Sequence, residues 1–285
     1  MISTGGHLTI LESVDSTNNY AMGRVRTGLA KHGDGFFAMA QVQGKGQRGK
    51  AWITERGTNI IITLVMRPGS LQLQQQFQLS VAVALAARDF FAHYAGDETF
   101  IKWPNDIYWN DRKAGGILIE NIIVRRQSSG VNEDVIRDMS NVRGKSQDPK
   151  IDGSPKEVAT DGSGLTCWQW AIIGIGININ QTVFPENIRN PVSLKQITGK
   201  DRDVIELGKE LCGYIQNRYE QLLAGTDLLS EYNNRLYKKD QTVKFKKDSR
   251  VFEGVVKQVN ILGELIVLTA LEEHFNFGEV EWVLK

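Results

Sequence analysis

The sequence predicts an α/β (α+β) protein in which a large mixed domain is followed by a small β-barrel. In the first part of the chain, apolar β-branched runs such as Asn59–Met66 alternate with helical patterns such as the alanine-rich Leu73–Tyr94. From Gln241 to Lys285 the pattern changes to short alternating runs separated by turn signals. We therefore expect one domain over residues 1–237 and a barrel over residues 238–285.

Each element of the large domain has its own sequence signal. Polar residues that favour helix starts precede the first expected helix, and a Pro-Gly pair stops the strand at Asn59–Met66. The expected strands are Leu8–Val14, Phe36–Gln43, Asn59–Met66, Thr99–Trp103, Ile107–Trp109, Gly116–Val124 and Leu165–Ile175. The expected helices are Asn19–Thr27, Leu73–Tyr94, Ser193–Thr198, Arg202–Ala224 and Leu228–Leu236.

The stretch from 125 to 164 differs from its surroundings. It is rich in Ser, Gly, Asp, Asn, Lys and Arg and has little apolar periodicity. Such composition cannot bury enough apolar surface to form a packed unit. We expect residues 125–164 to be a flexible insertion without regular structure, most simply a tolerated surface loop.

Composition excludes several classes of function. The chain has 285 residues, 41% of them hydrophobic and 24% charged, and its net charge is 34 − 33 = +1. A near-neutral chain lacks the basic footprint of a nucleic-acid binder, so we expect no DNA partner. No apolar run approaches the roughly 18 residues of a membrane span, and the start of the chain lacks a secretory signal. We therefore expect a cytoplasmic protein that does not contact membranes.

The cysteines and histidines suggest neither a disulfide framework nor a zinc site. Cys167 and Cys212 lie far apart in apolar surroundings, which predicts two buried free thiols. The four histidines are scattered, without the spacing of zinc ligands. No convincing nucleophile triad is present, so catalysis through a covalent enzyme intermediate is not expected.

The most informative stretch is FIKWPNDIYWNDRKAGGILIE, residues 100–120. Two strand-like runs flank a polar hairpin that contains Lys102, Asn105, Asp106, Arg112 and Lys113. Cations and carboxylates gathered at a sheet edge suit the binding of phosphates and a metal ion. An isolated Asp-Arg-Lys tip is more often a solvated turn, so this motif requires support from the rest of the chain.

A glycine-rich loop, residues 41–52 (QVQGKGQRGKAW), follows the second expected strand. Its glycines let the backbone approach an anion closely, and Lys45, Arg48 and Lys50 supply neutralising charge. The loop matches neither the Walker pattern nor the dinucleotide fingerprint. A basic glycine-rich turn is more often solvated than functional, so alone this signal is moderate.

Two shorter motifs complete the set. Asp15-Ser16-Thr17-Asn18-Asn19 has the chemistry of a helix N-cap, which would be a purely structural role. The segment 174–180, GIGININ, is a strand end whose glycines are explained equally well by close strand packing. Neither motif identifies a function by itself.

Taken in order, the four motifs resemble those of biotin protein ligases, also called holocarboxylase synthetases or biotin–acetyl-CoA-carboxylase ligases. Only seven residues precede the first expected strand, so the resemblance is to the form that lacks the N-terminal DNA-binding domain. It implies a class II aminoacyl-tRNA-synthetase-like catalytic domain, with a mixed sheet and helices, and a C-terminal Src-homology-3-like barrel. The closing phrase FGEVEW, residues 277–282, fits that barrel.

The resemblance also implies a reaction. Biotin's carboxylate attacks the α-phosphate of ATP to give biotinyl-5′-adenylate, and a lysine of a biotin carboxyl carrier protein or domain of a biotin-dependent carboxylase then takes the biotinyl group. ATP and biotin are the substrates and Mg²⁺ is the expected metal. The sequence leaves the oligomeric state open, a homodimer included.

Site residues carry over by motif position. The resemblance implies that Lys113, Lys45 and Asp106 are catalytic and that Asp106 lies near the magnesium ion. The implied biotin-binding residues are Ser16, Thr17, Asn18, Gln41, Lys45, Gly46, Gln47, Lys113, Gly115 and Gly116. The implied ATP-binding residues are Arg48, Lys50, Trp52, Asn105 and Asn178. Many bacterial members carry arginine at the position of Gln47, so Arg48 or Lys50 would share the retention of the adenylate here.

Two alternatives remain open. A lipoate or octanoate protein ligase shares the domain, but it predicts an apolar pocket in place of Ser16 and Thr17. A non-catalytic sensor of biotin or nucleotide would bind biotin without releasing pyrophosphate. The presence of Lys113 and Asp106 argues against the sensor.

Overall fold

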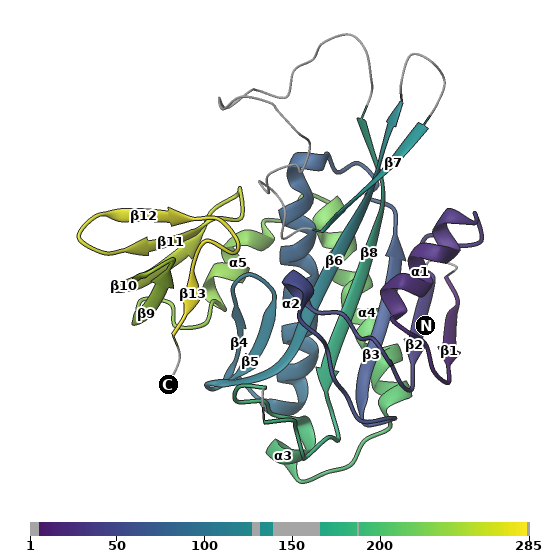
Figure 1. The fold of residues 1–285 in the computed structure, drawn as a ribbon, viewed down its shortest axis with the longest axis horizontal. Helices are drawn as coiled ribbons and strands as arrows, with labels where there is room; N and C mark the ends of the chain where they lie inside the picture. The colour runs from purple at the N-terminus through teal and green to yellow at the C-terminus, as the bar shows by residue number, and fades with distance from the viewer. Residues whose placement is uncertain (1–5, 127–131, 139–165, 187, 284–285) are drawn as a thin grey trace.

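A computed structural model of the chain describes residues 6–126, 132–138, 166–186 and 188–283. Within them, eight strands form a large sheet in the order β1-β2-β3-β8-β6-β5-β4, with β7 paired to β6 (Figure 1). Only β1 and β2 pair in parallel, which confirms the expected mixed sheet. The strands are β1 (Leu8–Leu11), β2 (Gly35–Ala38), β3 (Asn59–Met66), β4 (Thr99–Lys102), β5 (Asp106–Trp109), β6 (Arg112–Arg126), β7 (Asn132–Asp138) and β8 (Thr166–Asn178).

Helices cover this sheet unequally. The two long helices pack together on one face, where alternate residues of β8 such as Ile173 and Ile175 join the main core. The first helix lies on the other face over a smaller cluster that includes Val65 and Ile172. The helices are α1 (Thr17–Arg26), α2 (Gln76–Ala95), α3 (Leu194–Thr198), α4 (Val204–Leu223) and α5 (Leu228–Asn234), with short 3₁₀ turns at Gln47–Gly49 and Leu73–Gln75. No helix in the described ranges is long and apolar enough to cross a bilayer.

Part of the expected insertion has regular structure. We predicted none between 125 and 164, but residues 132–138 form β7, whose backbone pairs with residues 120–126 of β6. An antiparallel ladder satisfies backbone polar groups whatever the side-chain pattern, and composition does not reveal this. Residues 127–131 and 139–164 lie outside the described ranges.

The C-terminal residues form a second, antiparallel sheet in the order β12-β11-β10-β9-β13. Its core contains Phe245, Val256, Val267 and Phe275, all at most 1% exposed. The strands are β9 (Thr242–Lys247), β10 (Arg250–Val259), β11 (Leu265–Leu268), β12 (Glu272–Phe275) and β13 (Glu281–Trp282). This is the small barrel that the alternating pattern predicts.

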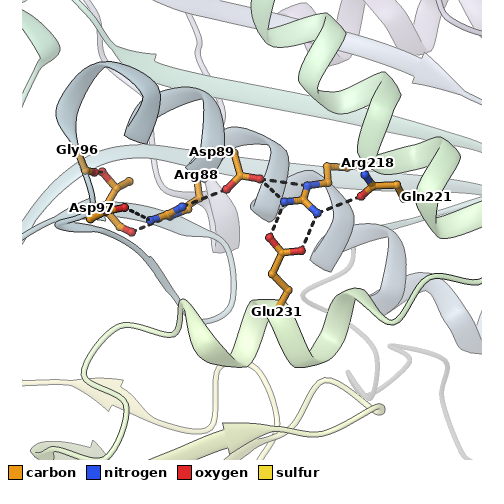
Figure 2. A network of polar contacts seen from close by, with 8 residues as sticks. Arg88, Asp89, Gly96, Asp97, Arg218, Gln221 and Glu231 are labelled. Atoms are coloured by element: carbon orange, nitrogen blue, oxygen red, sulfur yellow. Dashed lines mark hydrogen bonds and ion pairs between the residues drawn. The ribbon is translucent and has the colours of Figure 1, made fainter.

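An ion-pair network joins three helices beneath the sheet (Figure 2). Arg218 of α4 contacts Asp89 of α2 at 2.5 Å and Glu231 of α5 at 2.6 Å. Arg88 of α2 extends the network, since its Nη1 lies 3.2 Å from Asp89 and its Nε donates to the Thr99 carbonyl at 2.9 Å. The guanidinium of Arg218 therefore fixes α5 against the two long helices.

Helix α5 in turn connects the large sheet to the barrel. The hydroxyl of Tyr232, a fully buried residue, donates to the Pro104 carbonyl at 3.2 Å, just before β5. Asn233 makes two hydrogen bonds with the backbone of Val259 in β10, at 2.7 and 2.9 Å. The network around Arg218 thus supports both the polar hairpin and the barrel.

The cysteines differ from expectation in one respect. Cys212 is buried in the core, and burial raises the pKa of its thiol to about 12. Cys167 is exposed because it lies on the face of β8 opposite to its buried neighbour Trp168. The prediction of a buried thiol is therefore wrong for Cys167.

We predict that Arg218→Met lowers the free energy of unfolding by about 2 kcal/mol, because Asp89 and Glu231 lose their shared cation. Partial solvent exposure of the network keeps the loss below that of a fully buried pair. Urea unfolding measures it. Lys209→Met, which removes an exposed pair with Glu206, is the control and should cost under about 0.5 kcal/mol. Equal losses in the two variants would contradict a supporting role for Arg218.

Candidate functional site

The site is built over two positions on one face of β8, Gly174 and Gly176, that carry no side chain. Gly174 and Gly176 alternate with core isoleucines and so face away from α2 and α4. A Cβ added at Gly174 would lie 2.2 Å from Oδ1 of Asn18, and one at Gly176 would lie 2.4 Å from the ring of Trp52. The start of α1 and the end of the glycine loop therefore rest directly on neighbouring positions of the same strand.

A buried polar cluster forms at the start of α1. Ser16, Thr17 and Asn18 are each less than 5% exposed. The backbone N–H and the hydroxyl of Thr17 both donate to Oε1 of Gln41, at 2.7 and 3.0 Å. Burial of polar atoms costs free energy unless they are hydrogen-bonded, so the hydrogen bonds of this cluster are needed to hold its side chains in defined positions.

Asn18 is oriented by two side chains from the sheet. The hydroxyl of Thr63 in β3 lies 2.6 Å from its Oδ1, and its Nδ2 donates to Oε2 of Glu120 in β6 at 2.8 Å. Neither Thr63 nor Glu120 was among the predicted site residues. Thr63 is the one hydroxyl in the apolar run NIIITLVM, and that isolated polar residue is the signal that could have identified it.

The side chain of Ser16 does not have the helix-capping role that its motif suggested. Ser16 occupies the N-cap position of α1 with an extended backbone, but its side chain makes no capping hydrogen bond. Asp15 is bonded instead by Nδ2 of Asn19 at 2.6 Å, and this hydrogen bond lowers the pKa of the Asp15 carboxyl. The hydroxyl of Ser16 is thus buried at the helix start without serving as the cap.

The glycine loop is fastened at both ends of its span. It closes on itself through hydrogen bonds from Trp52 N to Gly44 O at 2.8 Å and from Gly46 N to Lys50 O at 2.6 Å. On one side, Lys45 Nζ donates to Oδ1 of Asn19 in α1 at 2.5 Å. The predicted residue Gln47 begins the short 3₁₀ turn within the loop.

Arg48 fastens the other side of the loop to the barrel. Its backbone has a positive φ of 56°, which few non-glycine residues adopt. Its Nη1 donates to the carbonyl of Gly278 at 3.4 Å. The loop therefore lies between α1 and the barrel, with Trp52 packed on the sheet below.

The polar hairpin places two cations on one carboxylate. Lys113 Nζ lies 2.6 Å from Oδ1 of Asp106, and Lys102 Nζ lies 4.0 Å from Oδ2. Lys113 Nζ is also 6.0 Å from the centre of the Trp52 ring. Lys113 thus lies between the hairpin and the glycine loop. Its side chain borders Gly116, and that of Trp52 borders Gly176.

Lys102 is the third residue that the sequence prediction missed as a site residue. Burial lowers the pKa of its ammonium, opposed by the carboxylate of Asp106 and assisted by the positive charges of Lys113 and Lys50. The signal was available, because Lys102 stands in the same motif as Asp106. What the motif could not show is that its side chain is buried.

Three other predicted residues contact the backbone of neighbouring segments. Nδ2 of Asn178 donates to the carbonyls of Val192 at 3.1 Å and Lys113 at 3.4 Å. Asn105 donates to the Ile117 carbonyl and accepts at its own carbonyl from Ile117 N. A Cβ at Gly115 would lie only 2.8 Å from the Gly176 carbonyl. These residues hold the strands around Lys113, and the amide donors of Asn178 are not directed into open space.

The residues do not form a metal site of their own. The described part of the chain has no group of three or more His, Cys, Asp or Glu side chains able to hold a metal ion. Asp106 is a single carboxylate already faced by Lys113 and Lys102. Mg²⁺ bound near such a group would depend mainly on nucleotide phosphates and water for its ligands.

A hollow of about 200 Å³ lies elsewhere, between α2, the α4–α5 turn and the barrel. It is lined by residues such as Phe77, Leu222 and Ile261, and none of the predicted site residues lines it. The candidate site is instead the surface formed by the start of α1, the glycine loop and the hairpin.

We predict that Gly176→Ala displaces Trp52 and frees the glycine loop. Overpacking of a close contact costs about 1–3 kcal/mol, and cleavage by a protease follows the population of the open form. Trypsin should therefore cut after the loop cations about tenfold faster than in the unaltered chain. Gly213→Ala, where an added Cβ meets nothing within 4 Å, is the matched control. Unchanged cleavage in Gly176→Ala would contradict the packing of Trp52 described above.

Comparison with known proteins shows which families part of the chain resembles. Residues 10–132 match the family model of the Biotin/lipoate A/B protein ligase family. The biotin--[acetyl-CoA-carboxylase] ligase of Paracoccus denitrificans is 38% identical over 115 residues, 39% of this chain and 46% of the relative. The bifunctional ligase/repressor BirA of Bacillus spizizenii is 28% identical over 222 residues, 77% of this chain and 55% of the relative. The chain spans about a third to a half of the length of the curated relatives it matches.

The fold comparison covers nearly the whole chain. A biotin protein ligase from Aquifex aeolicus, solved in complex with biotin and ATP, superposes with a TM-score of 0.70 at 20% identity, over 98% of this chain and 99% of that one. The class II synthetase-like sheet and the C-terminal Src-homology-3-like barrel expected from the sequence are thereby confirmed. The chain is therefore similar to the biotin/lipoate A/B protein ligase family over residues 10–132 and has the fold of biotin protein ligases.

Proposed function

We propose that this protein is an ATP-dependent biotin ligase of the cytoplasm. It would activate biotin as biotinyl-5′-adenylate and transfer it to a lysine of a biotin carboxyl carrier protein. The observation that carries the proposal is the placement of Lys113, Trp52 and the start of α1 along one side-chain-poor face of the sheet. A ligand with a polar ring at one end and a carboxylate at the other matches that sequence of surfaces.

The polar ring would bind at the start of α1. A ureido group has two N–H donors and one carbonyl acceptor, and a buried unmatched group would cost about 1–3 kcal/mol. The buried hydroxyl of Ser16 can donate and accept. The hydroxyl of Thr17, which already donates to Gln41 and accepts from Thr63, can accept a further hydrogen bond. The rigid hydrogen bonds among these side chains favour one ligand orientation.

The carboxylate end would react beside Lys113. A carboxylate oxygen of biotin forms a bond to the α-phosphorus of ATP while the bond to the β-phosphate oxygen breaks and pyrophosphate leaves. Negative charge grows on the α-phosphate oxygens during this step, and the ammonium of Lys113, held at 2.6 Å by Asp106, is positioned to stabilise it. Positioning and electrostatics are sufficient here, without a covalent enzyme intermediate.

The glycine loop would protect the intermediate. The mixed anhydride hydrolyses if water reaches it, and a loop fastened to α1 by Lys45 and to the barrel by Arg48 limits that access. In the second step the acceptor's lysine amine attacks the biotinyl carbonyl, an amide forms and AMP leaves. The identity of the acceptor belongs to this proposal and rests on the named activity of relatives such as the Paracoccus ligase.

A lipoate or octanoate ligase is the second candidate, because the matched family includes lipoate ligases. The buried hydroxyl of Ser16, which makes no capping hydrogen bond, favours biotin, since an acyl chain would offer it no partner. ATP–pyrophosphate exchange run with biotin, lipoate and octanoate separates the candidates. Exchange that occurs with biotin but not with lipoate or octanoate supports the proposal. Exchange that occurs with lipoate or octanoate but not with biotin rejects it.

We predict that Lys113→Ala reduces pyrophosphate release with biotin and ATP by about a hundredfold or more, the scale expected for losing one preorganised charge. Stopped reactions with labelled ATP measure the rate. Lys209→Met, far from the site on α4, serves as the control. A rate in Lys113→Ala equal to that of the unaltered chain would remove Lys113 from the reaction.

A further inference from the structure

We infer that Lys102 is a positioning residue that sets the charge of the reactive cluster, and that Trp282 of the barrel holds it there. The inference rests on the proposed function, because the cluster is the one proposed to meet the phosphates of ATP. It assigns a role to a buried cation outside the predicted site and to a residue of the C-terminal sheet.

Lys102 is enclosed rather than solvated. Its side chain is 13% exposed, and its ammonium lies 4.0 Å from Oδ2 of Asp106. The same nitrogen lies 5.3 Å from the centre of the Tyr108 ring and 5.4 Å from that of Trp282. An ammonium within about 6 Å of aromatic faces is attracted by their quadrupoles, most strongly by tryptophan.

The charge count explains what Lys102 contributes. Lys113 and Asp106 alone form a neutral pair, in which the ammonium is largely compensated by its partner. With Lys102 on the second carboxylate oxygen, the three groups carry a net charge of +1. A triphosphate approaching Lys113 then meets a cationic cluster rather than a neutral one, and in a site of reduced dielectric this difference is large.

Trp282 makes this arrangement depend on the barrel. Its ring packs against Phe245 of the barrel core at 5.0 Å and against Tyr237, which precedes the barrel, at 5.9 Å between centroids, and these contacts fix its position. A second contact holds the same hairpin to the barrel, since Nε1 of Trp103 donates to the Gly263 carbonyl at 3.0 Å. Figure 1 shows β13 beside β4 and β5, where the reactive hairpin begins.

The test compares Lys102→Met with Lys102→Arg. Lys102→Met keeps an unbranched apolar stem and removes the charge, and we expect the KM for ATP to rise about tenfold while the KM for biotin stays within about twofold. Lys102→Arg restores a cation and should recover at least half of that loss on a logarithmic scale. If Lys102 had only a packing role, its loss would change the KM values for ATP and biotin alike, and the cation in Lys102→Arg would not restore the KM for ATP.

Lys247→Met is the matched control. Lys247 makes the same kind of contact, with its ammonium 5.2 Å from the centre of the Phe275 ring, on the barrel itself. Its loss should leave both KM values unchanged. If Lys102→Met also leaves the KM for ATP unchanged, or raises both KM values equally, the inference is wrong.

A second pair of variants tests the role of the barrel and applies if Lys102→Met does not fold. Trp282→Phe keeps an aromatic face and Trp282→Leu does not, so only Trp282→Leu should raise the KM for ATP strongly. Equal effects of the two would overturn the part assigned to Trp282. Calorimetric titration with a non-hydrolysable ATP analogue distinguishes failure of the proposed function from failure of this inference. It measures the effect of the Lys102 charge on nucleotide binding even if the protein shows no biotin-dependent exchange.

Discussion

The absence of side chains at two neighbouring positions on one face of β8 is the constraint on which the site depends. Because Gly174 and Gly176 offer only backbone, Asn18 can reach the sheet at one position and Trp52 at the next. Any side chain there would keep the start of α1 and the glycine loop apart from the strand. Lys113 stands near the start of the adjacent strand β6, so three segments distant in sequence border one surface.

Support for that surface comes from the opposite side of the sheet and from the barrel. Arg218 fixes α5 against α2, and α5 in turn bonds both the segment before β5 and strand β10. The barrel reaches the site at two further points, through Gly278 on Arg48 and Trp282 on Lys102. The position of the reactive cations therefore depends on α2, α4, α5 and the barrel, although these elements contribute no side chain to the ligand surface.

Sequence reasoning succeeded where the informative residues are adjacent in the chain. The strand Asn59–Met66 and the hairpin with Lys113 and Asp106 were predicted because a single period or motif defines each. Sequence reasoning failed where a side chain's hydrogen-bonding or packing partner comes from a distant part of the chain. Thr63 and Glu120 meet Asn18 only because β3, β8 and β6 are neighbours in the sheet. Likewise β7 and the contact of Lys102 with Trp282 depend on pairings that local composition does not encode.

The most direct measurement is a crystal structure with a non-hydrolysable analogue of biotinyl-5′-adenylate. The account predicts the ring of the biotin moiety against Ser16 and Thr17 and the phosphate within about 3 Å of Lys113 Nζ. A ligand bound instead in the hollow lined by Phe77 and Leu222, with Lys113 untouched, would contradict it.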